Sequence, residues 1–530
     1  MTAQTKTKKN KSRDTIPANK EASLLFTGSE WDAPLIDKVY NAIEDIAIGE
    51  MGLDPYPSQI EVITSEQMLD AYASTGMPLF YHHWSFGKHY AYNESMYRKG
   101  FQGLAYEIVI NSDPCVCYIM EENSATMQTL VIAHAAFGHS HFFKNNYVFQ
   151  QWTDASGIID YLSFAKAYIA KCEDQHGPAA VERMIDAAHA LQSHGIHRYP
   201  RKRKLSLADE ADRERVRREH GEALFNDLWR TVPEGEGKKV SIDDAMEARQ
   251  REILGLPEEN ILYFLEKTAP RLAPWQREIL RIVRLIAQYF YPQRQTKMMN
   301  EGCATYTHHR IMTRLHEKGQ ISDGQFMEFL HSHSGVVMQP DYNDPRFNGI
   351  NPYALGFAMC EDIERICTQP TEEDLEWFPD FAGKGNHMQV LKDIWANFRD
   401  ESFVLQYLSP HLIRKLGLFH IVDDSDEEEI EVAAIHDERG YLKVRRALSR
   451  DYDVSRSDPN IQVCDVDLAG DRCLNLTHHV SEGVLLDEDD TWRVLRHLAN
   501  LWGYPVALKE VDPDGKTIEL YQIEPEDPLG

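Results

Sequence analysis

The chain is poor in cysteine and has no long apolar run. Its 530 residues include eight cysteines, none of them in a CxxC pair, which argues against a disulfide framework or a cysteine-ligated zinc site of the usual spacing. We interpret them as reduced thiols of a cytoplasmic protein. No segment approaches the roughly 20 apolar residues that a membrane-spanning helix needs, so we expect no membrane span. A glycine-rich phosphate fingerprint and a GxSxG nucleophile elbow are also absent.

Positive charge is scarce as well. The chain has 56 lysines and arginines against 84 aspartates and glutamates, a net charge of −28. Such acidity argues against general nucleic-acid binding, which needs a basic surface. Basic residues gather in the first 22 residues, which we expect to form a disordered tail, and in RKRKLSLADEADRERVRREHGEAL, residues 201–224. The second segment fits a solvated helical face, or a docking site for an acidic partner or a phosphate.

The apolar pattern predicts an α+β fold with a mostly helical main domain over residues 23–415 and a small α+β domain over residues 416–530. In the main domain we expect a strand leading into a helix over 59–74, then strands at 105–110 and 115–120 joined by a turn. A small mixed sheet of the zincin type would result. In the second domain, short alternating segments predict one helix at 491–503 and strands at 441–446, 461–468, 473–479, 506–511 and 517–523.

Three histidines interrupt an apolar helical run, LVIAHAAFGHSHF, from Leu130 to Phe142, with Ser124 expected as the N-cap of this helix. Histidines four residues apart, as in the zinc-protease motif HExxH, lie about 40° apart on a helix, whereas His134 and His139 are about 140° apart. Their convergence on one metal requires a π-bulge or an unwound helix near Gly138. The alternative is that all three are hydrogen-bonded core residues.

A second segment, MMNEGCATYTHHRIM, supplies a carboxylate on a later helix. Its residues 300–304 have the form NEGxA, which often carries the third zinc ligand of gluzincin metallopeptidases, and His308 shares a helical face with Glu301. We therefore predict a metal site formed by His134, His139 and Glu301, with zinc as the metal and iron as the alternative.

The predicted site lacks the usual general base. Where HExxH has its catalytic glutamate, this chain has Ala135, so another group must accept the proton. Glu121 and Glu122, at the end of the preceding strand, are the nearest carboxylates in sequence. Together with His308 they are the candidate catalytic residues, and each of the three would act as a base or support a metal ligand.

Other histidines form weaker clusters. Glu173 with His176, and Asp186 with His189, have the three-residue spacing of ligands in helical di-iron proteins. Further histidines that would line a pocket or lie on the surface are His82, His83, His89, His331 and His333.

Several long strings resemble the stage V sporulation protein R (SpoVR-like) family. They include GLAYEIVINSDPCVCYIMEEN, AHAAFGHSHFFKNNY, WQREILRIVRLIAQYFYPQRQTKMMNEGCATY and NGINPYALGFAM, and the resemblance runs from about Ser29 to the end of the chain. His134, His139, Glu301 and His308 match the family pattern, whereas His141 lies outside it. The missing glutamate beside His134 is a trait of the family.

The resemblance implies a link to assembly of the spore cortex, a peptidoglycan layer, or to the stationary-phase stress response in bacteria that do not sporulate. It also implies a PrkA-type serine kinase and a protein with a von Willebrand-like domain as partners. Two functions then compete: a zincin-like metal-dependent amide hydrolase, and a non-catalytic regulatory scaffold that acts with the kinase. In the second, the C-terminal domain and residues 201–218 would be the docking surfaces. A di-iron protein is a third hypothesis. The oligomeric state stays open.

Overall fold

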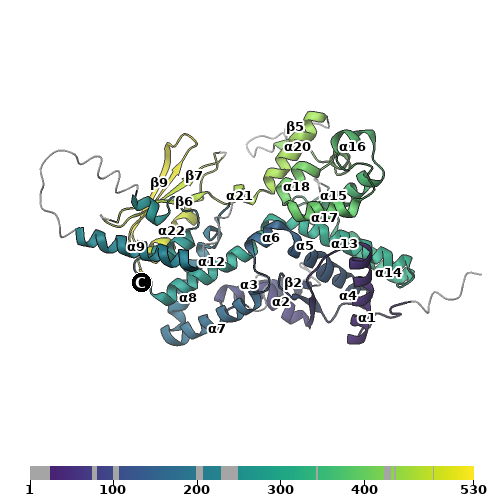
Figure 1. Ribbon diagram of the computed structural model, residues 1–530, viewed down its shortest axis with the longest axis horizontal. Helices are drawn as coiled ribbons and strands as arrows, with labels where there is room; N and C mark the ends of the chain where they lie inside the picture. Colours follow the sequence, from purple (N-terminus) through teal and green to yellow (C-terminus); the bar gives the residue numbers. More distant parts are fainter. Residues whose placement is uncertain are drawn as a thin grey trace, which may run out of the picture.

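The computed structural model confirms a mostly helical α+β fold, whose described residues form three small sheets (Figure 1). It describes residues 24–74, 80–98, 107–198, 207–227, 249–341, 344–422, 431–434, 437–468, 470–481 and 483–529. The basic tail expected over residues 1–22 and the first part of the charged segment, 201–206, lie outside the described residues.

A three-stranded mixed sheet precedes the histidine helix. Strand β1 (Ser58–Ile63) runs parallel to β3 (Cys115–Met120), and β2 (Glu107–Ile110) pairs antiparallel with the other edge of β3. The predicted hairpin of β2 and β3 and the predicted strand before helix α2 (Ser65–Ala73) are confirmed. Strand β2 lies at an edge of the sheet, so one side of it has no neighbouring strand among the described residues. Its first residue, Glu107, can therefore lie beside the helices that follow the sheet.

The histidine helix has three parts, α4 (Ala125–Ile132), η3 (Ala133–His139) and α5 (Ser140–Asn145). Ser124 caps it as predicted, because its hydroxyl accepts from the Met127 amide. The apolar core around this helix is formed with α1 (Ala33–Glu44), η2 (Asp45–Glu50), α13 (Lys297–Glu317), α14 (Asp323–Val336), α15 (Pro352–Thr368), α16 (Glu372–Trp377), α17 (His387–Asn397), α18 (Asp400–Tyr407), α19 (Pro410–Lys415) and α20 (Glu438–Asp451).

Helix α13 lies unusually close to its two neighbours. A Cβ atom added to Gly138 of η3 would lie 2.5 Å from the Ala304 Cα atom of α13. A Cβ atom on Gly302 would lie 2.6 Å from the Gly356 carbonyl carbon of α15. Only glycine fits at such contacts, since real Cβ atoms do not approach backbone this closely. These glycines therefore set how near Glu301 comes to the histidine helix.

A second apolar core unites helices of the middle of the chain with the C-terminal sheet. That sheet has the order β6-β7-β8-β9, and its four strands confirm the predictions for 461–523. The elements are α7 (Ile158–His176), α8 (Pro178–Ala190), α11 (Ile261–Thr268), α12 (Pro274–Gln295), β6 (Ile461–Val466), β7 (Leu474–His479), α22 (Glu488–Trp502), β8 (Val506–Val511) and β9 (Thr517–Ile523). The same stretch of chain also contains η4 (Gln192–His194) and α9 (Leu207–Asp227).

The predicted strand at 441–446 is wrong, because these residues belong to helix α20. Tyr441, Val444 and Leu448 recur at helical spacing and are buried in the first core, so the short alternating run was one part of a longer helical pattern. The remaining elements are α3 (Trp84–Arg98), α6 (Tyr147–Trp152), β4 (His420–Val422), β5 (Glu431–Ala434) and α21 (Val454–Ser457). Within the described parts of the chain, every helix is too short or too polar to cross a membrane.

Candidate metal centre

The bulge that the histidine spacing required is present. Residues Ala133–His139 form a π-helical segment between two α-helical ones. A π-helix hydrogen-bonds from i to i+5 and has a wider turn, so side chains five apart fall on the same face. The rings of His134 and His139 accordingly lie together, with their centroids 4.5 Å apart. The deviation from α geometry that convergence of the two histidines requires is therefore present.

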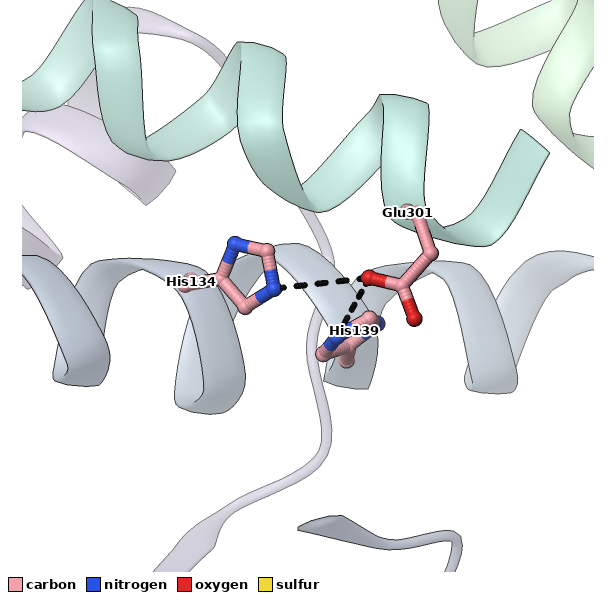
Figure 2. Close-up of side chains that lie close together, drawn as sticks. All are labelled: His134, His139 and Glu301. Carbon is pink, nitrogen blue, oxygen red and sulfur yellow. Dashed lines mark ion pairs between the residues drawn. The ribbon is translucent and has the colours of Figure 1, made fainter. Parts of the chain in front are cut away.

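Glu301 of α13 points at both rings (Figure 2). Its Oε2 atom lies 3.7 Å from His134 Nε2 and 3.5 Å from His139 Nε2. The three candidate ligand atoms all lie within 4.8 Å of one another. Glu301 Oε2 is buried and has no hydrogen-bond partner, which is unusual enough for a carboxylate oxygen to call for an explanation.

The Nδ1 atom of each ring already has a hydrogen-bonding neighbour. His139 Nδ1 lies 2.9 Å from Asn300 Oδ1, which only accepts, so Nδ1 carries the hydrogen and the lone pair is on Nε2. His134 Nδ1 lies 2.9 Å from His308 Nδ1. The opposite nitrogen of His308 lies 3.0 Å from His333 Nδ1. Hydrogen bonds to Nδ1 of this kind orient histidines that bind metals through Nε2.

A fourth charged group comes from the edge strand. Glu107 Oε1 lies 3.7 Å from His134 Nε2. Burial raises the pKa of this carboxyl, and the charge of Glu301 adds to that effect, whereas His134 opposes it. Sequence reasoning missed Glu107, although a glutamate in the otherwise apolar strand EIVI, close before the histidine helix, was a usable signal.

The pKa shifts favour the protonation states that a metal site needs at His139 and Glu301, whereas His134 has to lose a proton first. Burial lowers the pKa of His139 to about 4, so this ring is neutral at pH 7. Burial acts in the opposite sense on Glu301, but His139, His134 and Tyr353 outweigh it and lower the pKa of this carboxyl. For His134, burial is outweighed by Glu301 and Glu107, whose charges raise the pKa of the ring.

The site and the fold can now be compared with known proteins. The family model described as SpoVR like protein matches residues 30–457, and the model described as SpoVR-like C-terminal domain matches residues 459–513. The chain belongs to the SpoVR family. A protein of Escherichia coli strain K12, described as uncharacterized protein YcgB, is 50% identical over 504 residues, which are 95% of this chain and 97% of that relative.

No solved structure matches the chain. Family membership confirms the resemblance of the sequence to SpoVR-like proteins. The cortex and stress roles, and the kinase and von Willebrand partners that the resemblance implies, stay predictions.

The structure separates the predicted catalytic residues of this SpoVR-family chain. His308 is buried and touches His134, as expected of a group that supports a ligand. Glu121 and Glu122 are exposed in the turn after β3, and Glu122 accepts from the Ser65 amide. Neither carboxylate lies within 4 Å of a nitrogen of His134 or His139, whereas Glu107 does.

His333 contacts His308, whereas His141, His176 and His83 have partners outside the metal centre. His141 Nδ1 accepts from the Asp54 amide, away from Glu301. His176 stacks on Trp275, and Asp186 binds His83 and Trp84, so the pairs considered for a di-iron site do not converge. In the described ranges, the three residues His134, His139 and Glu301 are the one group with metal-ligand geometry.

Proposed function

We propose that the chain is a metal-dependent hydrolase whose metal ion, zinc or alternatively iron, is held by His134 Nε2, His139 Nε2 and the Glu301 carboxylate. The observation that carries the proposal is the unpartnered Glu301 Oε2 atom facing two Nε2 atoms. Two imidazoles and one carboxylate are a ligand set that zinc and iron accept, and three protein ligands leave a coordination position open.

The arrangement of elements supports a zincin-like reading. A mixed sheet with an antiparallel edge strand precedes the histidine helix, and the third ligand comes from a later helix. A zinc or iron ion bound there would supply Lewis-acid activation of water for hydrolysis. The reaction class that fits is amide hydrolysis, which agrees with the link to peptidoglycan, a polymer with amide cross-links, that the family resemblance implies.

Glu107 replaces the glutamate missing from the HExxH position. It faces the same nitrogen of His134 as Glu301 does, and its raised pKa brings it nearer to the operating range of a general base. Its role is to accept a proton from water at the open position and return it to the leaving nitrogen. His308 keeps His134 oriented through the Nδ1 contact, and Asn300 does the same for His139.

Metal content tests the proposal. The wild type, His134→Ala, Glu301→Gln and the control Asp186→Asn are purified without a His tag and subjected to elemental analysis. We expect about one zinc or iron per chain in the wild type and in the control, and its loss from both site variants. Glu107→Gln should keep the metal and lose amide hydrolysis.

The contrary result would favour the other hypothesis. If the wild type takes up no metal after reloading, or Glu301→Gln keeps it, the histidines are packing groups. The chain would then be better explained as a regulatory scaffold, and pull-downs that depend on the C-terminal residues and not on His134 would be the next step.

A further inference from the structure

A cavity of about 710 Å³ lies in the second core, apart from the metal centre. It opens where α9 meets α11, α12 and the C-terminal β6 and α22, which gather at one end of the molecule (Figure 1). One wall is apolar and is formed by Leu254, Phe264, Val466, Leu468 and Trp502. Ligand pockets are typically about 300–1,000 Å³, so the cavity has the size of a small-molecule site.

The lining also contains more cations than carboxylates, in a chain whose net charge is −28. Five cationic side chains line the cavity, together with three glutamates: Arg217, Arg218, Lys267, Arg277 and Arg281. Each glutamate lies near one of these cations. Glu214 lies 4.0 Å from Arg218, Glu278 lies 3.5 Å from Arg281, and Glu266 lies 3.1 Å from Lys267.

The other two cationic side chains of the lining, Arg217 and Arg277, form no ion pair with these three glutamates. The guanidinium of Arg277 donates hydrogen bonds to the backbone oxygens of Glu266, Ala269 and Leu272, so its role is structural. Arg217 has no carboxylate within 4 Å in the described part of the chain, and its Nη2 atom is buried with no hydrogen-bond partner. A buried donor without a partner is costly, and one that lines a cavity indicates a group that belongs there.

Arg217 also explains the charged helix that the sequence analysis left open. Most side chains of α9 between residues 208 and 219 are exposed, as in a solvated helix. Glu214, Arg217 and Arg218 are spaced three and four residues apart, so they share the face that lines the cavity. Of the residues of α9, only those on this face line the cavity.

We propose that this cavity binds a nucleoside phosphate, with the phosphates at Arg217 and its neighbouring cations and the base against the apolar wall. Arginine suits phosphate because its planar fork donates two parallel hydrogen bonds. The apolar residues of the lining fit the flat, poorly hydrated face of a base, which inorganic phosphate lacks. The proposal does not depend on the metal centre.

The test measures binding to the full chain by calorimetry and by thermal shift, with ATP, ADP, adenosine and inorganic triphosphate as probes. Because phosphates chelate metals, it is run in the Glu301→Gln background as well as in the wild type. We expect ATP or ADP to bind and to raise the melting temperature. Arg217→Gln should weaken binding at least about tenfold, the loss typical of one charge-assisted contact.

The matched control is Arg215→Gln on the same helix, because Arg215 is exposed and pairs with Asp212 and Glu219. It should bind as the wild type does. Leu254→Asp, which places a negative charge in the apolar wall, should weaken ATP more than triphosphate. The melting temperature without ligand shows that each variant folds.

Three results would overturn the proposal. The first is no binding of either nucleotide to the folded wild type. The second is equal affinity of Arg217→Gln and wild type. The third is adenosine or inorganic triphosphate binding as tightly as ATP, because the cavity would then recognise only one half of the ligand.

Discussion

Two histidine clusters in the described part of the chain differ in the contacts of their ring nitrogens. In the metal centre, the Nδ1 atoms of His134 and His139 contact a neighbour, and both Nε2 atoms face a carboxylate oxygen that has no hydrogen-bond partner. In the second cluster, His83, just before α3, contacts Ser85 through Nδ1 and Asp186 of α8 through Nε2. His189 Nε2 lies 2.6 Å from the Tyr81 hydroxyl.

The difference separates a ligand set from a hydrogen-bond network. Both clusters contain two histidines and a carboxylate, and both are largely buried. In the second, the side-chain contacts satisfy the groups without a metal, and the Trp84 indole adds another donor to Asp186. In the first, the Nε2 atoms of both rings lie 3.5 to 3.7 Å from Glu301 Oε2, too far for a hydrogen bond. Such an arrangement is stable only with a cation or a shared proton.

The largest expected effect is on metal-dependent stability. A chelator should lower the melting temperature of the wild type by several degrees, because a ligand at about 1,000 times its Kd contributes about 4 kcal/mol. Glu301→Gln should not respond, whereas His189→Gln in the second cluster should respond as the wild type does. Differential scanning calorimetry makes the comparison. An equal response of Glu301→Gln and wild type would contradict it.

Gly302→Ala should be the next largest change. Its methyl group would lie 2.6 Å from the Gly356 backbone, so α13 must move away from α15, at a cost of about 1–3 kcal/mol. Gly87 of α3, beside the second cluster, has nothing within 4 Å, so Gly87→Ala should stabilise the chain by up to about 1 kcal/mol. Urea midpoints measure both. The same sign for the two variants would show that the helix contact is not tight.

Metal affinity should rise with pH. Burial disfavours the charged His134 ring, but Glu301 and Glu107 outweigh burial and raise its pKa in the metal-free chain. A proton must leave Nε2 before a metal binds, so below that pKa the affinity should increase about tenfold per pH unit and then level off. Competition with a chromophoric chelator between about pH 5.5 and 8 tests this.

The variant Glu107→Gln gives a second test of this pH dependence. Removing one of the two charges that raise the pKa of His134 should move the levelling-off to lower pH. His139, whose pKa burial lowers to about 4, adds no second step in this range. Affinity that is independent of pH would mean that His134 Nε2 is not a ligand.

The smallest effect is expected in the second cluster. Asp186→Asn weakens the acceptor for His83 and Trp84 and should cost about 1 kcal/mol of unfolding free energy, the typical worth of a hydrogen bond. Its metal content should equal that of the wild type. A loss of metal from this variant would contradict the distinction between the two clusters.

Local pattern determined much of this protein. The apolar periodicity predicts the β2–β3 hairpin, the capped histidine helix and the four C-terminal strands, because the period of a segment depends on residues close in sequence. The five-residue spacing of His134 and His139 requires a break in α geometry if the two rings are to converge, and η3 provides it. The apolar periodicity gave a wrong prediction at 441–446, where the alternating run was too short to distinguish a strand from helix α20.

Only the tertiary structure decided which groups meet. Glu107 and Glu301 lie 27 and 167 residues from His134 in the sequence, and no local pattern specifies that both face its Nε2 atom. The same holds for Asn300 and His308, which use the Nδ1 atoms, and for the face of α9 that places Arg217 in a cavity. Lone pairs and charges become distinctive only when packing removes their water, and packing is a property of the whole fold.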